Sequence, residues 1–382
     1  MSHFSYESHD QLRQRQSAKW RAYESDVIPA WIAEMDFALA EPIARVLTDA
    51  ITRSDTGYAW TSDLGVALCS FARQRWQWEI DPECVMPVAD VLTGVGQVLL
   101  ALTQPGEAVV ITSPVYPPFF STVMKVAHRD LVDVPLLYLD GRYTFDRAAM
   151  RMAFSRPEVT AFLACSPHNP TGRVFDRDEM TFISTLAQEF SVLVVSDEIH
   201  GPLTHHGYEF IPYLTLAGDE SAVSVISASK AWNIAGLKCA QVVSSTRELH
   251  AKLHERIPLE VQQGAGHLGV LAAQAAYFDG VTWLDEMLTH LGRQKELLRA
   301  LLAEHMPLIE LVQPQASYLA WLDCRALNLD RDPAAFFMDR ARVGLNSGPT
   351  FGPTGHGFAR LNFATSPEIL TQVIERMAAA VR

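Results

Sequence analysis

Four short, nearly continuous apolar runs constrain the fold of this chain more than any other feature. They cover residues 107–112, 159–165, 191–197 and 222–227, and they are rich in β-branched residues. Runs of this length without polar alternation are typical of parallel strands that are buried on both faces. Such strands need a covering layer on each side, so the pattern predicts a sheet flanked by helices.

Amphipathic stretches between these runs supply the predicted helices. The segment 175–190, "FDRDEMTFISTLAQEF", places its apolar residues on one face. The expected helix opens with Asp176, and Glu179 follows three residues later, which is the pattern of a capping box. Alternation of strand, helix and strand predicts βαβ crossovers. The expected fold class is therefore α/β, with a mainly parallel sheet of the seven-stranded type.

The pattern changes after Gly280, where a smaller α+β unit is expected. A long amphipathic helix is followed by "IELVQPQASYLAWLDC" (309–324), which predicts a hairpin of strands, and a final helix ends the chain. The amino-terminal segment is expected to pack with this unit. The predicted domains are a large one over residues 46–282 and a small one over residues 1–45 and 283–382.

Composition excludes several classes of partner. Asp and Glu outnumber Lys and Arg by 44 to 31, giving a net charge of −13, and no basic block is present, so a nucleic acid is not expected. No apolar run is long enough to span a membrane. The polar start lacks the apolar core of a signal peptide, and the five scattered cysteines predict reduced thiols. A cytoplasmic protein is expected.

Polar and aromatic side chains follow the ends of the predicted strands. Tyr116, Asn169, Asp197 and Lys230 each come after one of the four apolar runs. In open α/β sheets the ligand binds beyond the carboxyl ends of the strands, so these residues are expected to converge. The stretch "LTGVGQVLLAL" (92–102) predicts a glycine-rich turn that leads into a helix, whose free N–H groups would bind an anion.

Each of these signals has an ordinary structural explanation when taken alone. An aspartate after a strand is usually a cap or turn residue, and the glycine-rich turn matches neither nucleotide-binding fingerprint. The adjacent His205 and His206 lack a metal-binding framework, so no metal is predicted. The set is more specific than its members. An amine, a carboxylate, an aromatic ring and an anion site together suit pyridoxal phosphate.

Several motifs carry a resemblance to a known family. The segments "SPHNPTGR", "SDEIH" and "SASKAWNIAGLK" resemble the class I and II aminotransferases, which are pyridoxal-phosphate enzymes of fold type I. The segments "PAWIAEMDF", "TGYAW" and "FGPTGHGFARLNFA" are similar to the MalY/PatB branch of cystathionine β-lyases, also called cysteine-S-conjugate β-lyases. The resemblance covers nearly the whole chain.

The resemblance implies a role for individual residues. Lys230 would bind pyridoxal phosphate covalently and act as the base, with Tyr58 and Tyr116 as further catalytic residues. Arg360 would hold the substrate carboxylate, in a substrate site shared with Asn169, Trp31 and Tyr58. The cofactor-binding residues would be Lys230, Asp197, Asn169, Tyr116, Val95, Gly96, Ser227, Lys238, His200 and Tyr58.

The same resemblance implies a reaction and an assembly. The reaction would be elimination from cystathionine or another cysteine S-conjugate, giving a thiol, pyruvate and ammonia, within sulfur amino-acid metabolism such as methionine biosynthesis. An aminotransferase shares all of these cofactor contacts and stays open as the alternative. A homodimer is expected, in which Tyr58 reaches the cofactor phosphate of the neighbouring subunit.

Overall fold

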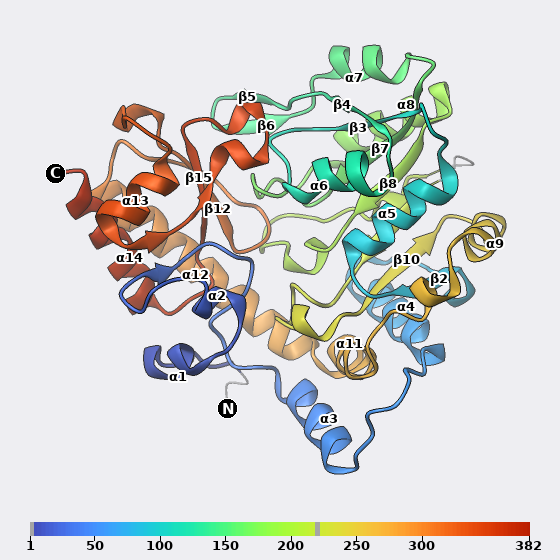
Figure 1. Ribbon diagram of the computed structural model, residues 1–382, viewed down its shortest axis with the longest axis horizontal. Coiled ribbons are helices and arrows are strands. Elements are labelled where there is room, and N and C mark those ends of the chain that lie inside the picture. The colour runs from blue at the N-terminus through green and yellow to red at the C-terminus, as the bar shows by residue number, and fades with distance from the viewer. Residues whose placement is uncertain (1–3, 218–221) are drawn as a thin grey trace.

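The computed structural model describes residues 4–217 and 222–382 (Figure 1). We call the part built around its seven-stranded sheet the large domain and the part built around its four-stranded sheet the small domain. The large domain contains a seven-stranded sheet in the order β2-β10-β9-β8-β7-β3-β4. All neighbouring strands pair in parallel except β10, which is antiparallel to β2 and to β9. The strands are β2 (Val85–Val88), β3 (Ala108–Ile111), β4 (Asp130–Asp133), β7 (Val159–Cys165), β8 (Leu193–Asp197), β9 (Ala222–Ile226) and β10 (Ala240–Ser244).

The four strands predicted from the apolar runs are all present, as β3, β7, β8 and β9. They are buried almost throughout, because helices cover both faces of the sheet. One core contains side chains of β3, β7 and β8 with helices α5 (Val91–Leu102) and α9 (Arg247–Arg256). The opposite core contains α7 (Arg147–Phe154) and α8 (Arg177–Phe190). The predicted fold class is confirmed.

The predicted start of α8 is confirmed in detail. The side chain of Asp176 accepts a hydrogen bond from the backbone of Glu179 at 2.9 Å, and the Glu179 side chain accepts one from the Asp176 N–H at 2.9 Å. This reciprocal pair satisfies two N–H groups that a helix start leaves free. Glu179 also pairs with Arg173, and both side chains are 6% exposed.

The predicted glycine-rich turn before α5 is wrong. The helix already begins at Val91, with Asp90 as its amino-terminal cap accepting a hydrogen bond from Thr93 at 2.9 Å. Gly94 therefore lies inside the helix. A Cβ at this position would meet side chains of Val242 and Val225 at 3.0 and 3.1 Å, so the glycine permits close packing of helix on sheet. The sequence pattern alone does not separate a turn glycine from one that serves helix packing.

The small domain contains a four-stranded antiparallel sheet in the order β11-β12-β15-β14. The predicted hairpin is present as β11 and β12. The strands are β11 (Glu310–Val312), β12 (Leu319–Asp323), β14 (Asn346–Ser347) and β15 (Phe358–Asn362), and the helices are α12 (Val281–His305), α13 (Pro333–Ala341) and α14 (Pro367–Ala380).

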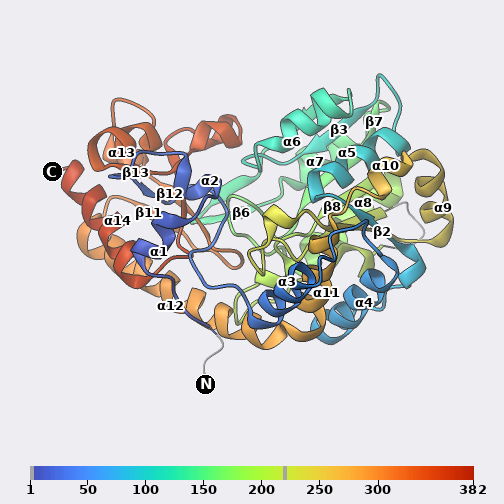
Figure 2. The same cartoon turned by 60° about the horizontal axis from the view of Figure 1, so that its bottom comes forward.

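The amino-terminal segment lies beside the small domain, as both ribbon views show (Figures 1 and 2). Helices α1 (His9–Gln14) and α2 (Ala18–Arg21) precede β1 (Ile28–Pro29), which pairs in parallel with β13 (Val343–Gly344). The chain then enters α3 (Glu41–Thr52), which contacts α11 (His267–Asp279) of the large domain. The predicted domain limit at residue 45 therefore lies inside α3.

The remaining elements complete the large domain. Helix α4 packs against α11, and a short hairpin precedes α7. Among the described residues, no helix combines the length and apolar character needed to cross a membrane. These elements are α4 (Ser62–Trp76), α6 (Pro118–Ser121), α10 (Leu259–Gln262), β5 (Leu137–Leu139) and β6 (Arg142–Thr144).

Candidate active site

A cavity of about 270 Å³ lies at the carboxyl ends of β7, β8 and β9. Cys165 and Asp197, the last residues of two neighbouring strands, are paired in register and both line the cavity. This is the place where open α/β sheets bind ligands. Eight of the residues predicted from the sequence line it together: Tyr116, Asn169, Asp197, His200, Ser227, Lys230, Lys238 and Arg360.

Lys230 carries the amine of the cavity. It lies in the turn that follows β9, and its Nζ donates a hydrogen bond to the carbonyl oxygen of Ala33 at 3.1 Å. Burial lowers the pKa of Lys230 to about 8, and the positive charge of Arg360 acts in the same direction, while Asp197 opposes both. An amine with this pKa is unprotonated in part near neutral pH, as a nucleophile and a base must be.

Asp197 supplies a buried carboxylate at the end of β8. It is 4% exposed, and its Oδ1 accepts a hydrogen bond from the Ile199 N–H at 3.1 Å. Burial raises the pKa of Asp197 to about 7, against the opposing effects of that hydrogen bond and of Lys230. A cationic N–H group of a ligand placed beside it would stabilise the ionised carboxylate.

Arg360, on β15 of the small domain, is a buried cation whose hydrogen-bond partners among the described residues are all neutral. Its two terminal nitrogens donate to Asn169 Oδ1 at 2.9 Å, to Trp31 O at 3.1 Å and to Asn346 Oδ1 at 2.6 Å. Its Nε is buried without a hydrogen-bond partner in the part of the chain that the structure describes, and burial lowers the pKa of Arg360 to about 10. A buried cation without a counter-ion indicates a site for an anionic ligand group such as a carboxylate.

The amino end of α5 lies at one end of the cavity. Asp90, Val91 and Leu92 line it, and Lys238 lies beside them with its Nζ 2.9 Å from Asp90 Oδ2. The N–H groups of the first helical turn have no partner inside the helix, so those of Val91 and Leu92 can bind a phosphate.

Val95 and Gly96 do not provide these N–H groups, contrary to the prediction. Both lie in the second turn of α5, where backbone N–H groups bond within the helix, and neither lines the cavity. The predicted position differs by one turn because α5 begins at Val91, before the glycines, and not after them. Asp90, a capping residue three positions before Thr93, was the sequence signal that could have located it.

Ser227 also lines the cavity, but its hydroxyl proton is already donated within the protein. Its Oγ donates to the carbonyl oxygen of Cys239 at 2.6 Å and accepts from the Ser229 N–H at 3.0 Å. The hydroxyl therefore shapes the turn that carries Lys230. Ser229 itself lines the cavity and was not predicted.

Two ring side chains complete the cavity wall. Tyr116 follows β3 and is partly buried against the apolar core of the sheet. His200 is 3% exposed, and its Nδ1 has no hydrogen-bond partner within residues 4–217 and 222–382. Burial lowers the pKa of His200 to about 3, with Lys230 and Arg360 acting in the same direction. The imidazole is therefore neutral near pH 7.

Tyr58 and Trp31 stand apart from the cavity lining in a single chain. The Tyr58 side chain is fully exposed, in the loop between α3 and α4. Trp31 contributes its backbone carbonyl to Arg360, while its ring packs against Tyr23 with ring centroids 5.5 Å apart. The predicted cofactor and substrate roles of Tyr58 stay predictions that depend on a second subunit.

The donor set of the cavity fits pyridoxal phosphate. It places an amine, a buried carboxylate, an aromatic ring and an anion-binding helix end around one space. No group of three or more His, Cys, Asp or Glu side chains suited to a metal occurs among residues 4–217 and 222–382. His205 is instead buried between the carbonyl oxygens of Pro314 and Ser317.

Comparison with known proteins shows which family and which relatives this chain is similar to. The family model described as aminotransferase class I and II matches residues 44–377. The chain is 35% identical to cystathionine beta-lyase PatB of Bacillus subtilis, covering 96% of this chain and 97% of that protein. A Mycobacterium tuberculosis protein provisionally named cystathionine beta-lyase is 44% identical, covering 97% and 96%.

A solved structure has the same fold. The pyridoxal-phosphate-bound C–S lyase from Staphylococcus hominis aligns with a TM-score of 0.90 at 26% identity, covering 97% of this chain and 96% of that one.

Proposed function

This chain belongs to the aminotransferase class I and II family, and we propose that it is a pyridoxal-phosphate-dependent carbon–sulfur lyase. Its substrates are cystathionine or related cysteine S-conjugates, and its products are a thiol, pyruvate and ammonia. The cavity supports the cofactor and an amino-acid substrate. The observation that carries the choice of reaction is the near full-length similarity to proteins named cystathionine beta-lyase at 35 to 44% identity.

Several cavity residues would hold the cofactor for this reaction. Lys230 would bind it covalently, and Asp197 would keep its pyridine nitrogen protonated. Asn169 would donate to its phenolic oxygen, Tyr116 would contact its ring, and the N–H groups of Val91 and Leu92 would bind its phosphate with Lys238. When bound, pyridoxal phosphate supplies an aldehyde that condenses with amines and a protonated ring that withdraws electrons from the substrate α-carbon.

The chain's own groups then bind and deprotonate the substrate. Arg360 holds the substrate carboxylate through its guanidinium, including the Nε–H that has no partner among the described residues. The free amine of Lys230 accepts the proton from the α-carbon. The electron pair of the broken Cα–H bond expels the thiolate from the β-carbon, and the thiolate takes the proton held by Lys230 and leaves as a thiol. Water then converts the remaining fragment to pyruvate and ammonia.

The proposed reaction is tested with purified protein, added pyridoxal phosphate and cystathionine as substrate. We expect pyruvate and free thiol in equal amounts without any added 2-oxo acid. Conversion of the cofactor to its amine form, together with a strict requirement for a 2-oxo acid, would instead identify an aminotransferase. A panel of other cysteine S-conjugates, scored for the same two products, identifies the preferred leaving group.

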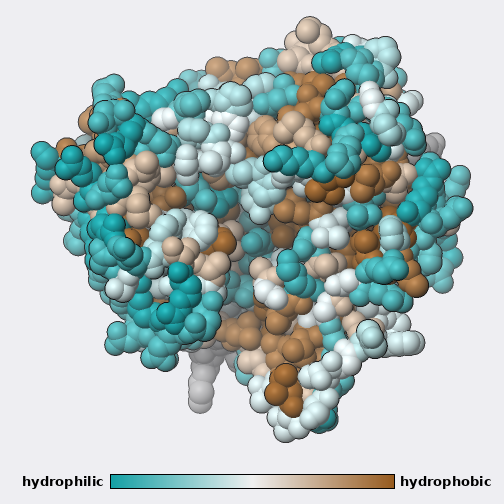
Figure 3. Space-filling view, viewed as in Figure 1, coloured by the Kyte–Doolittle hydropathy of each residue, from teal (hydrophilic) through white to brown (hydrophobic). Residues whose placement is uncertain are grey.

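We also propose that the protein is a homodimer with shared active sites. Tyr58 is fully exposed and Trp60 is 75% exposed, in a loop next to α3. Further apolar side chains are exposed on α3, α4 and α11, namely Ile51, Val66 and Phe278. Figure 3 shows apolar residues gathered over α3. A second subunit on this surface would bury them and bring Tyr58 to the partner's phosphate site.

A cytoplasmic location is part of the proposal. Its support is that all five cysteines are buried and unpaired, as expected of a protein kept in a reducing compartment.

A further inference from the structure

A segment of the amino-terminal region hydrogen-bonds to both Arg360 and Lys230. This anchor segment comprises residues 31–35 and has no regular secondary structure. The carbonyl oxygen of Trp31 accepts from Arg360 at 3.1 Å, and that of Ala33 accepts from Lys230 at 3.1 Å. One short stretch of backbone thus connects the small-domain guanidinium with the large-domain amine.

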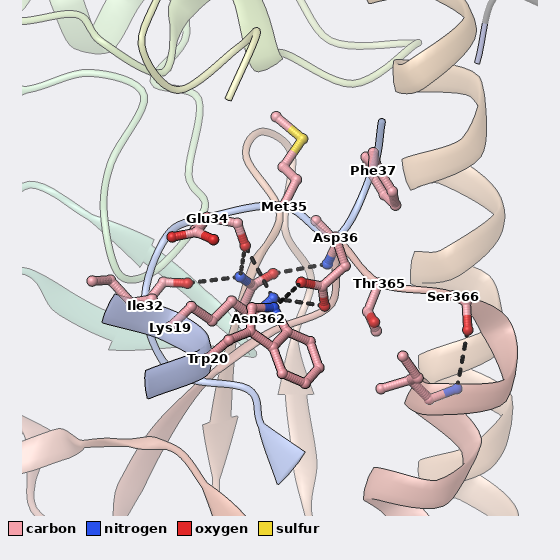
Figure 4. Close-up of polar contacts among 12 residues, drawn as sticks. Lys19, Trp20, Ile32, Glu34, Met35, Asp36, Phe37, Asn362, Thr365 and Ser366 are labelled. Atoms are coloured by element: carbon pink, nitrogen blue, oxygen red, sulfur yellow. Dashed lines mark hydrogen bonds and ion pairs between the residues drawn. The ribbon is translucent and has the colours of Figure 1, made fainter. Parts of the chain in front are cut away.

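Asn362, on β15, donates hydrogen bonds to two other carbonyl oxygens of the anchor segment. Asn362 Nδ2 donates to Ile32 O and to Glu34 O, each at 2.7 Å, as Figure 4 shows. Asn362 lies two residues after Arg360 on the same strand, so both side chains stand on one face of the sheet. Strand β15, which carries Arg360, therefore also holds the anchor segment to which Arg360 donates its hydrogen bond.

A matching arrangement holds the other end. Asn233, three residues after Lys230, accepts from Met35 N at 2.8 Å and donates to Met35 O at 2.9 Å. Asn233 has a φ of +58°, which turns its amide toward the anchor segment. Arg360 and Lys230 are thus each followed, within three residues, by an asparagine that hydrogen-bonds to the anchor segment.

A buried ion pair closes the end of the segment. Lys19 Nζ lies 2.8 Å from Asp36 Oδ2, and the two side chains are 1% and 2% exposed. Lys19 also donates to Glu34 O at 3.1 Å, and Trp20 Nε1 donates to Asp36 Oδ1 at 2.9 Å (Figure 4). All five carbonyl oxygens from Trp31 to Met35 therefore accept from a side chain, so the segment's position is set from several elements at once.

We propose that the anchor segment holds Arg360 and Lys230 in register, and that Asn362 and Asn233 are its positioning residues. Neither asparagine lines the cavity, so each acts through the backbone of residues 31–35. The inference rests on the proposed amino-acid substrate, whose carboxylate must reach Arg360 while its α-carbon reaches Lys230. The relative position of Arg360 and Lys230 matters because a shift of about 1 Å in one binding group can weaken ligand binding and catalysis strongly.

The test measures ligand binding instead of turnover. Holoenzyme is titrated with L-alanine, which lacks a leaving group, and the dissociation constant is read from the cofactor absorbance. We expect Asn362→Ala to raise this constant about tenfold, since a displaced segment loses the hydrogen bond between Trp31 O and the charged guanidinium of Arg360, and such a bond is worth that much. Asn233→Gly, which removes both contacts to Met35 and tolerates the positive φ, should weaken binding as well.

Gln262→Ala is the matched control. Gln262 Nε2 also donates to two backbone carbonyls, those of His254 and Ile257 at 2.9 and 2.7 Å, but it is the last residue of α10 and does not line the cavity. Its alanine affinity should stay at the wild-type value even if its unfolding midpoint falls. Equal alanine affinities for wild type and both asparagine variants, or equal weakening in the control, would overturn the inference.

The outcomes also separate this inference from the proposed function. If Asn362→Ala does not fold, Asn233→Gly decides the question alone. A wild-type protein that binds alanine but forms no pyruvate from cystathionine would remove the proposed reaction and leave the anchoring role standing. Pyruvate formation with unchanged alanine binding in the variants would do the reverse.

Discussion

Lys238 Nζ lies 2.9 Å from Asp90 Oδ2, so the cation at the phosphate end of the cavity is paired with the residue that caps α5. The same carboxylate accepts from the Thr93 N–H through its other oxygen. Burial tends to raise the pKa of Asp90, but the Lys238 and Thr93 hydrogen bonds outweigh it and lower the pKa. The pair therefore holds a positive group beside the free N–H groups of Val91 and Leu92.

We expect Lys238→Met to weaken cofactor binding about tenfold or more, because the phosphate loses a charge-assisted partner. The unpaired Asp90 would also repel the phosphate. Titration of apoprotein with pyridoxal phosphate, followed by absorbance, measures the change. Lys238→Arg is the matched control, since it keeps the charge and the φ of +59° suits both residues equally. Unchanged affinity in Lys238→Met would place the phosphate elsewhere.

Replacement of Lys230 by alanine should remove both functions of its amine. Turnover should fall by at least about 10² to 10⁴, the usual contribution of a positioned base, and the absorbance of covalently held cofactor should disappear. Circular dichroism confirms that the fold is kept. Residual pyruvate formation near the wild-type rate would show that another group accepts the proton.

The rate should rise with pH through about 8, the pKa to which burial and then the Arg360 charge lower Lys230. Only the unprotonated amine accepts a proton, so protonation on the acid side removes activity. Because Arg360 disfavours the ammonium form, Arg360→Gln should move this limb to higher pH as well as weakening substrate binding. A pH–rate profile of both proteins measures the shift, and a limb that moves to lower pH would contradict the assignment.

Breaking the buried pair of Lys19 and Asp36 should destabilise the protein strongly. Asp36→Ala leaves a buried ammonium unpaired, and a loss of about 3–5 kcal/mol in the free energy of unfolding is expected. Urea unfolding of both single variants and of Lys19→Met with Asp36→Ala forms a double-mutant cycle. The double variant should lose less than the sum of the singles; strict additivity would mean that the two charges do not interact.

Shared active sites would be revealed by mixing two inactive variants. Tyr58→Ala and Lys230→Ala each damage a different part of the proposed composite site. After unfolding and refolding together, hybrid dimers contain one site with both native residues, so pyruvate formation should recover above that of either parent. The variants refolded separately are the control. No recovery, despite hybrid formation seen by a size tag, would place Tyr58 outside the partner's site.

Much of the architecture is determined locally and is readable from the sequence. The apolar runs that became β3, β7, β8 and β9 leave little choice of structure, because both faces of each strand need burial. Asp197 and Lys230 were predicted to converge because the carboxyl ends of parallel strands meet at one edge of the sheet. The capping box of α8 involves only neighbouring residues, and it was predicted down to its two side chains.

The tertiary structure decided what local pattern could not. Only the tertiary structure shows that Gly94 packs on β9 and β10 from inside α5 and does not form a turn, so the N–H groups at the cavity are those of Val91 and Leu92 and not those of Val95 and Gly96. The anchor segment bonds to Arg360 and Lys230, residues about 330 and 200 positions away. Contacts over such separations leave no periodicity in the sequence, since they are fixed only when both domains have packed against the amino-terminal segment.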